Sequence, residues 1–273
     1  MRSVRATLLR VGDIRSSILA TSYDVRGEIY LKAVQRTKEG KEVIFTNIGN
    51  PHSLGQQPVT FTRQVLSLVV NPDLLKLEGL HFPDDVISRA KLYLKHMKGG
   101  AGAYSDSKGL PCVREEIADF IKKKSGVNDV NIDNIFISNG ASEVARMALF
   151  ALIRGSDDGI MVPIPQYPLY SASIALYGGQ LVPYYLDEEK GWGLDINELR
   201  RSLEASRSKG VCVRALVFIN PGNPTGQCLT EENLRDLLAF CHENQLVLMA
   251  DEVYQENSEF QINQSSKLLL TNR

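Results

Sequence analysis

Polar side chains that could bind a small molecule follow apolar runs at several places along the chain. Asp251 ends the run Leu246–Ala250, and Tyr254 follows three residues later. Asn223 lies in a proline-rich turn, and Tyr167 lies in a loop bracketed by prolines. A carboxylate can pair with a protonated pyridine nitrogen, while asparagine and tyrosine can hydrogen-bond a ring oxygen or stack on the ring. These residues predict a site for an aromatic ring with a basic nitrogen.

The segment Asn139–Ser142 has the residue types of an anion site at the start of a helix. Ser142 is placed to cap a helix that begins at Glu143, after a strand over Asn134–Ser138. Free N–H groups and the helix dipole there would hold a phosphate. With the ring site, this predicts an aldehyde cofactor with a pyridine ring and a phosphate. Taken singly, each signal also has an ordinary explanation, namely a turn, a helix cap or a core tyrosine.

Motifs for two other phosphate ligands are missing from the sequence. Neither G-x-G-x-x-G nor G-x-x-x-x-G-K-[ST] occurs, so NAD and ATP have no motif support. The glycine-rich segment Gly99–Gly102 follows an expected helix rather than a strand, which indicates a loop.

Strands alternate with helices in the second half of the chain, which predicts a parallel α/β sheet. Ligands bind beyond the carboxyl ends of the strands in such sheets, so the polar groups named above should converge. The expected strands cover 134–138, 159–163, 180–186, 214–220 and 246–250, the last two of them buried. The expected helices cover 25–40, 60–70, 84–98, a segment around 113–121 ended by Gly126, one that starts at 143, and then 168–177, 196–209 and 230–244. A short β-like run covers 43–48.

Composition and charge are those of a soluble globular protein. Lys and Arg number 31 and Asp and Glu 32, so the net charge of −1 gives no overall attraction for nucleic acid or anionic lipid. No apolar run approaches the ~20 residues that span a bilayer.

The four cysteines have neither Cys-x-x-Cys spacing nor histidines at zinc spacing, which predicts reduced thiols and no metal site. Reduced thiols favour the cytoplasm, with mitochondria or peroxisomes as alternatives.

The N-terminal segment Met1–Thr21 is rich in arginine and contains one acid, Asp13. Such a segment is typical of an organelle transit peptide. An exposed N-terminal arm is the other interpretation, and it is the one that we favour.

Several strings along the chain resemble class I and II aminotransferases that use pyridoxal phosphate. The resemblance is closest to the alanine aminotransferase branch, which includes the plant glutamate–glyoxylate aminotransferases. It runs from about Tyr23 to Asn257. The strings that carry it are Asn47-Ile-Gly-Asn-Pro51, Gly102-Ala-Tyr-Ser-Asp-Ser107, Asn139-Gly-Ala-Ser142, Pro163-Ile-Pro-Gln-Tyr-Pro-Leu-Tyr170, Tyr184-Tyr-Leu-Asp-Glu188, Asn220-Pro-Gly-Asn-Pro-Thr-Gly226 and Ala250-Asp-Glu-Val-Tyr254.

The resemblance implies a role for eight residues. Ala141 and Ser142 would hold the cofactor phosphate, and Tyr167 would stack on the ring. The other five residues are Asn223 and Tyr254 at the 3′-oxygen, Asp251 at the pyridine nitrogen, Tyr104 at the phosphate of the neighbouring subunit, and Gly49 near the substrate carboxylate. The family is dimeric, with its sites at the interface.

The resemblance also implies the fold and the domains. The fold is that of type I pyridoxal-phosphate enzymes, with a large domain built on a mostly parallel sheet, here incomplete, and the N-terminal part of a small domain. Residues 1–53 would be an arm and partial small domain, residues 54–257 the cofactor-binding large domain, and residues 258–273 a divergent tail. The loss of similarity in this tail suggests an alternative transcript, a gene-model artefact or a truncated product.

The reaction implied is amino-group transfer from alanine or glutamate to 2-oxoglutarate, pyruvate or glyoxylate. Such enzymes need a lysine that forms a Schiff base with the cofactor, in a Ser-Lys-Gly-like segment well beyond the Asp-x-x-Tyr motif. Lys267 is followed by Leu268 rather than glycine and is not expected to be that lysine. One alternative is therefore an inactive truncated isoform that binds the cofactor weakly or pairs with a full-length subunit. Another is a carbon–sulfur lyase or an aminocyclopropane carboxylate synthase on the same scaffold.

Overall fold

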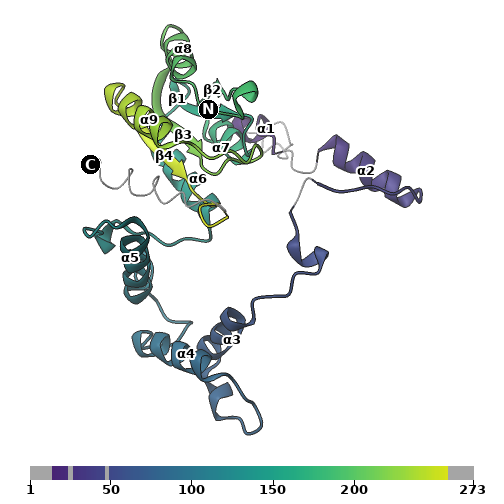
Figure 1. The fold of residues 1–273 in the computed structure, drawn as a ribbon, viewed down its shortest axis with the longest axis vertical. Helices are drawn as coiled ribbons and strands as arrows, with labels where there is room; N and C mark the ends of the chain where they lie inside the picture. The colour runs from purple at the N-terminus through teal and green to yellow at the C-terminus, as the bar shows by residue number, and fades with distance from the viewer. Residues whose placement is uncertain (1–13, 24–26, 47–48, 258–273) are drawn as a thin grey trace, which may run out of the picture. The chain divides into compact units, whose positions relative to one another are not determined.

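The computed structural model describes residues 14–23, 27–46 and 49–257, and these form two compact units. The first unit comprises residues 1–25, 124–127 and 138–273, and the second comprises residues 26–123 and 128–137. Figure 1 labels their helices and strands. The predicted domain boundaries at 53 and 257 stay predictions.

A four-stranded parallel sheet forms the centre of the first unit. Its strands are β1 (Asp158–Ile164), β2 (Gln180–Tyr185), β3 (Cys212–Ile219) and β4 (Val247–Asp251), in the order β2-β1-β3-β4. All three strand pairs are parallel, which confirms the predicted sheet. Ile219 pairs with Asp251, so β3 and β4 end at the same level.

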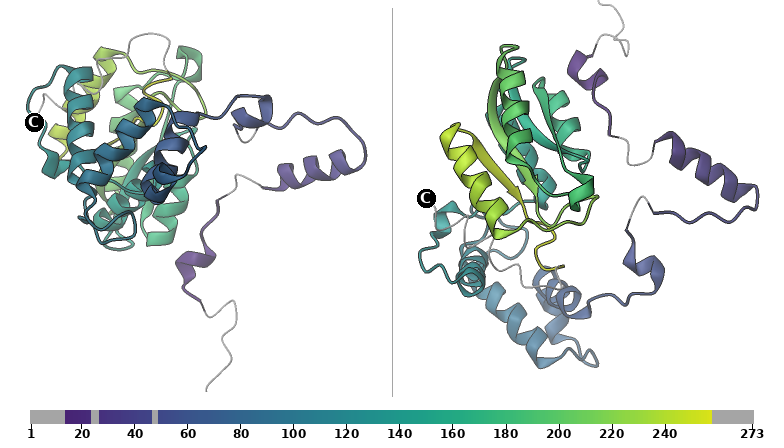
Figure 2. Two further views of the ribbon diagram at one scale, coloured as in Figure 1. Left: turned by 90° about the horizontal axis from the view of Figure 1, so that it is seen from below. Right: turned by 45° about the horizontal axis from the view of Figure 1, so that its top comes forward.

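Helices cover both faces of this sheet (Figure 2). Helices α8 (Ile196–Arg207) and α9 (Glu231–Glu243) pack on one face through buried leucines. Helices α6 (Ala141–Leu152) and α7 (Leu169–Tyr177) pack on the other face. Because both faces are covered, the residues of β3 from Ala215 to Ile219 are all buried, as predicted.

The local sequence explains where α9 begins and which side it buries. The hydroxyl of Thr230 accepts a hydrogen bond from the backbone N–H of Asn233 at 3.1 Å, which caps the helix. Leu234, Leu237 and Cys241 recur at helical spacing and are buried against the sheet.

A buried carboxylate fixes the start of the sheet. Asp158 is buried, and it accepts hydrogen bonds from the backbone N–H and guanidinium of Arg154 and from Nε of Arg214 at 2.7 Å. Burial alone would raise the pKa of Asp158, but the hydrogen bonds from Arg154 lower it below its ordinary value. The carboxylate is therefore ionised and paired in the folded protein.

The second unit is helical. Its helices are α2 (Glu28–Lys38), α3 (Thr60–Val70), α4 (Asp84–His96) and α5 (Pro111–Ser125), whose last two residues group with the first unit. Helices α3 and α4 pack together around a small core of Val65, Leu68, Val69, Val86 and Ala90.

Arg114 ties two loops of the second unit together. Its buried guanidinium donates to the carbonyl oxygens of Gly109 and Ile132 and to the carboxylate of Asp106.

The described chain also contains short helical segments. 3-10 turns lie at Pro51–Leu54, Pro72–Lys76, Ile132–Asn134 and Glu188–Lys190. A four-residue helix, α1 (Ser16–Leu19), lies near the N-terminus.

Three predictions about strands are wrong. Residues 134–138 form a 3-10 turn and an irregular segment, with the side chain of Phe136 63% exposed. Residues 43–46 form no strand, and 47–48 lie outside the described residues. An apolar run becomes a strand only when another strand pairs with it, and no described strand pairs with either segment. β4 exists as predicted but is not buried, since Val247 is 48% exposed at the sheet edge.

Candidate functional site

A cavity of about 190 Å³ opens at the carboxyl ends of the strands in the first unit. Four segments form it: the start of α6, the loop from β1 into α7, the end of β3 with the turn after it, and the end of β4 with the turn after it. The nine lining residues are Ala141, Ser142, Tyr167, Leu169, Ile219, Asn223, Asp251, Val253 and Tyr254. All six cofactor-site residues predicted in this unit are among them.

Asp251 is the acidic side chain of the cavity wall, and two hydrogen bonds fix its orientation. Oδ2 accepts a hydrogen bond from the hydroxyl of Tyr170 at 2.7 Å, and Oδ1 accepts one from the backbone N–H of Val253 at 3.2 Å. Tyr170 is buried, and burial and then the bond to Asp251 raise its pKa well above the ordinary range. Its hydroxyl therefore remains a donor, and the carboxylate keeps a fixed direction toward a ligand.

Helix α6 begins at the cavity wall, two residues earlier than predicted. Its N-cap is Gly140, which has a φ of 88° and therefore a backbone conformation that favours glycine. Ser142 lies inside the first turn, and no side chain caps the helix, so the predicted cap by Ser142 is wrong. The first backbone N–H groups of a helix have no acceptor within it, and here Ala141 and Ser142 present them beside the cavity.

Asn223 and Tyr254 meet across the cavity wall. Nδ2 of Asn223 donates to the Tyr254 hydroxyl at 3.3 Å, which brings together two groups from turns 31 residues apart. The turn that carries Asn223 is held from behind, because Oδ1 of the buried Asn220 accepts from the backbone N–H of Leu229 at 2.9 Å. Two polar groups are thus directed at one point of the cavity.

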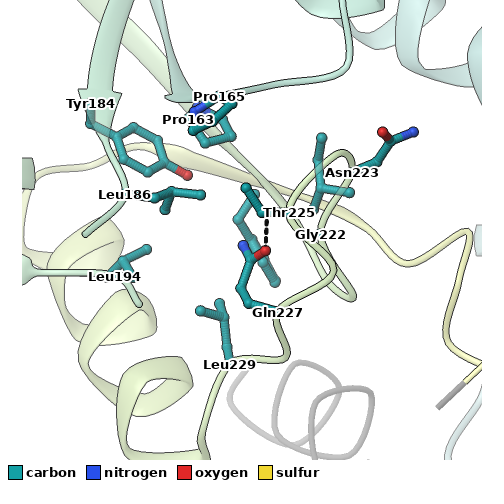
Figure 3. Close-up of a pocket in the computed structure, with 12 residues that line it drawn as sticks. Pro163, Pro165, Tyr184, Leu186, Leu194, Gly222, Asn223, Thr225, Gln227 and Leu229 are labelled. Atoms are coloured by element: carbon teal, nitrogen blue, oxygen red, sulfur yellow. Dashed lines mark hydrogen bonds between the residues drawn. The ribbon is translucent and has the colours of Figure 1, made fainter. Parts of the chain in front are cut away.

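Figure 3 shows the other side of the turn that carries Asn223. Thr225 and Gln227 hydrogen-bond each other there, and the backbone N–H of Gly222 donates to the carbonyl of Gln227 at 2.8 Å. The space between this turn and Tyr184 is a cavity of only about 10 Å³. It has room for about one water molecule and not for an organic ligand. The hydrogen bonds of Thr225, Gln227 and Gly222 beside this small cavity hold the turn in shape.

Tyr167 lines the cavity from the loop after β1. Its hydroxyl lies 2.7 Å from the hydroxyl of Tyr23, and the two rings meet edge to face. The hydrogen bond with Tyr23, and then burial, raise the pKa of Tyr167 to about 12. The phenol therefore stays neutral in the physiological range.

Other predicted residues are not part of this cavity. Gly49 and Tyr104 belong to the second unit, where Tyr104 is fully exposed, and their predicted roles stay predictions. Lys267 lies outside the described residues.

Two residues that hydrogen-bond to the cavity wall, Tyr170 and Tyr23, are not among the site residues predicted from the sequence. Tyr170 follows Tyr167 by three residues, about one helical turn, and this spacing could have indicated it. No local signal indicates Tyr23, which lies 144 residues before its partner.

The described residues contain no metal cluster and no membrane-crossing segment. No group of three His, Cys, Asp or Glu side chains within them could hold a metal ion. No helix of the described ranges has the length and hydropathy to cross a bilayer. The described cysteines are all free thiols.

Comparison with known proteins gives consistent matches. The family model described as aminotransferase class I and II matches residues 65–261. Glutamate–glyoxylate aminotransferase 2 of Arabidopsis thaliana is 55% identical over 246 residues, which are 89% of this chain and 51% of that protein. Alanine aminotransferase 2 of Panicum miliaceum is 52% identical over 264 residues, which are 92% of this chain and 55% of that protein.

A solved structure agrees with these sequence matches. The crystal structure of an aminotransferase from Escherichia coli superposes with a TM-score of 0.68 at 30% identity, and the match covers 89% of this chain and 51% of that one. The chain spans about half the length of the relatives that it matches.

Proposed function

Since the chain belongs to the aminotransferase class I and II family, we propose that it provides the cofactor-binding part of a pyridoxal-phosphate-dependent transaminase of the alanine aminotransferase branch. The observation that carries the proposal is the cavity at the strand ends. It gathers an oriented carboxylate, a hydrogen-bonded amide and phenol pair, an aromatic ring and a helix start in about 190 Å³. These groups match the chemistry of a phosphorylated pyridine ring with an oxygen substituent.

The two ends of the cavity fit the two ends of pyridoxal phosphate. The carboxylate of Asp251 would accept a hydrogen bond from the protonated ring nitrogen, in the direction that Tyr170 fixes. Asn223 and Tyr254 would bind the ring 3′-oxygen, and the ring of Tyr167 would stack on the cofactor.

The first turn of α6 fits the phosphate. The backbone N–H groups of Ala141 and Ser142 and the Ser142 hydroxyl would donate to phosphate oxygens, since no side chain caps the start of the helix. When bound, pyridoxal phosphate supplies an electron sink for substrate bonds at the α-carbon. The side chains named here bind and orient it, and Asp251 keeps the proton on the ring nitrogen.

The substrates proposed are alanine or glutamate as amino donor and 2-oxoglutarate, pyruvate or glyoxylate as acceptor. The names of the two plant relatives support both donor classes. We place Gly49 near the substrate carboxylate and Tyr104 at the phosphate of a second subunit, in a homodimer. The compartment proposed is the cytoplasm, with mitochondria or peroxisomes as alternatives.

The test of this proposal is cofactor binding by the whole purified chain. Saturable binding of pyridoxal phosphate is expected in equilibrium dialysis, with weaker binding of pyridoxal, which lacks the phosphate. Asp251→Asn should weaken binding about tenfold or more, because a charge-assisted hydrogen bond to the ring nitrogen is lost. Asp236→Asn, an exposed acid on α9, is the matched control and should bind like wild type. Absence of saturable binding, or equal binding by Asp251→Asn, would contradict the proposal.

A second measurement separates cofactor binding from turnover. The chain is saturated with pyridoxal phosphate, reduced with borohydride and mapped by peptide mass. One stoichiometric label at Lys267 would assign this lysine to catalysis, and alanine transamination should then be measurable. Saturable binding without such a label would favour the alternative of an inactive isoform that binds the cofactor or pairs with a full-length subunit.

A further inference from the structure

A tyrosine from the N-terminal part of the chain reaches the cavity wall. Tyr23 lies in the described segment 14–23, four residues after the end of α1. Its hydroxyl is 2.7 Å from that of Tyr167, and the ring centroids are 6.3 Å apart at an interplanar angle of 81°. The two side chains thus meet through a polar contact and an edge-to-face ring contact at once.

The segment that carries Tyr23 is attached to the body of the first unit. Helix α1 packs against α7, which lies next to it in Figure 1. The turn after α1 is closed by a hydrogen bond from the Thr21 hydroxyl to the carbonyl of Ser17 at 2.8 Å. Tyr23 is 41% exposed, so its contact with Tyr167 is not explained by burial in the core.

The ring of Tyr167 needs such a contact to keep one orientation. It lies in a loop between β1 and α7, and it is only partly buried. A phenol of this kind rotates about two side-chain torsions unless neighbours restrict it. Tyr23 contacts both the hydroxyl and the ring. The contact therefore restricts where the face of the Tyr167 ring points.

We propose that Tyr23 is a positioning residue of the cavity, which holds the Tyr167 ring in the orientation that a planar ligand needs. The effect on pyridoxal phosphate rests on the function proposed above, whereas the effect on Tyr167 itself does not. The high pKa of Tyr167 agrees with this arrangement, because the hydrogen bond with Tyr23 is its first cause and keeps the Tyr167 phenol protonated. The N-terminal segment thereby becomes part of the site.

The test compares four forms of the whole chain: wild type, Tyr23→Phe, Tyr167→Phe and the double variant. Each single change removes one hydroxyl and keeps the aromatic ring. Tyr185→Phe is the matched control, since Tyr185 is an exposed tyrosine at the end of β2. Thermal unfolding of every form is measured alongside, so that a general loss of structure is recognised.

The first readout needs no cofactor. With ¹³C-labelled tyrosine, the ring resonance of Tyr167 is identified by its loss in Tyr167→Phe. In Tyr23→Phe this resonance is expected to shift, while in Tyr185→Phe it stays in place. An unchanged Tyr167 resonance in Tyr23→Phe would overturn the proposal, whether or not the chain binds pyridoxal phosphate.

The second readout is the affinity for pyridoxal phosphate. Tyr23→Phe should weaken binding about threefold to tenfold, as expected for one hydrogen bond, without lowering the unfolding temperature to the same degree. Because both hydroxyls belong to one contact, the losses should not add. The double variant should bind pyridoxal phosphate as well as the single variant that has the lower affinity. Additive losses would overturn the proposal, and wild-type chain that fails to bind would overturn the proposed function alone.

Discussion

The two units of the molecule bury their apolar side chains to different degrees. In the first unit the sheet has a helix layer on each face, and each layer has its own buried cluster. In the second unit the buried cluster is confined to α3 and α4, while Ile29 and Leu54 are 87% and 88% exposed. Stability on folding scales with apolar area removed from water. We therefore expect the first unit to hold most of the folding free energy.

The largest expected effect comes from deleting a core side chain in each unit. Leu216 in β3 and Leu68 in α3 are both fully buried. Leu216→Ala should lower the free energy of unfolding of the first unit by about 2–5 kcal/mol, through lost transfer energy and the cavity left behind. The sole tryptophan, Trp192, belongs to the first unit, so its fluorescence in a denaturant titration follows that unit.

Leu68→Ala is the matched variant for the second unit. It should leave the tryptophan transition in place and should remove hydrogen-exchange protection from α3 and α4. A tryptophan midpoint that shifts as far in Leu68→Ala as in Leu216→Ala would show that the two units share one unfolding transition, and the comparison would then be wrong.

A smaller effect is expected at the buried carboxylate of β1. Asp158→Asn should cost about 1–3 kcal/mol, because the buried acceptor of the hydrogen bonds from Arg154 and Arg214 loses its charge. The pKa of Asp158 is lowered by folding, so its contribution is full above about pH 4 and is lost as the pH falls through the native pKa. The difference between wild type and variant in urea titrations should therefore shrink on acidification. A difference that grows toward low pH would contradict this assignment.

The smallest effect separates a helix cap from a ligand group. Thr230→Ala should cost about 1 kcal/mol, because the cap of α9 is lost. Ser142→Ala should change the free energy of unfolding by less than about 0.5 kcal/mol, since Ser142 caps nothing. It should nevertheless weaken binding of pyridoxal phosphate in dialysis. Equal destabilisation by the two changes would mean that the Ser142 hydroxyl supports α6 after all.

The sequence predicted the sheet and most of its helices because their signals are local. Apolar runs such as 214–220 and helical spacing such as that of Leu234, Leu237 and Cys241 are visible within a few residues. Six predicted cofactor-site residues meet in one cavity because parallel strands bring their carboxyl ends to one edge.

The predictions failed where the structure depends on a distant partner or on backbone geometry. Residues 134–138 have the composition of a strand but no described pairing partner. The start of α6 is set by the positive φ of Gly140 rather than by the hydroxyl of Ser142. The contact between Tyr23 and Tyr167 joins segments whose proximity follows from no periodicity.

The order of the strands has a consequence for synthesis on the ribosome. β1 emerges first, β2 pairs with one side of it and β3 with the other, and β4 then pairs with β3. Each new strand thus meets an edge that is already formed, and no earlier pairing has to be undone, as suits a chain that folds while it emerges. β4 brings Asp251, and Tyr254 follows it, so the residues that line the ligand cavity are all present only after β4 has been added.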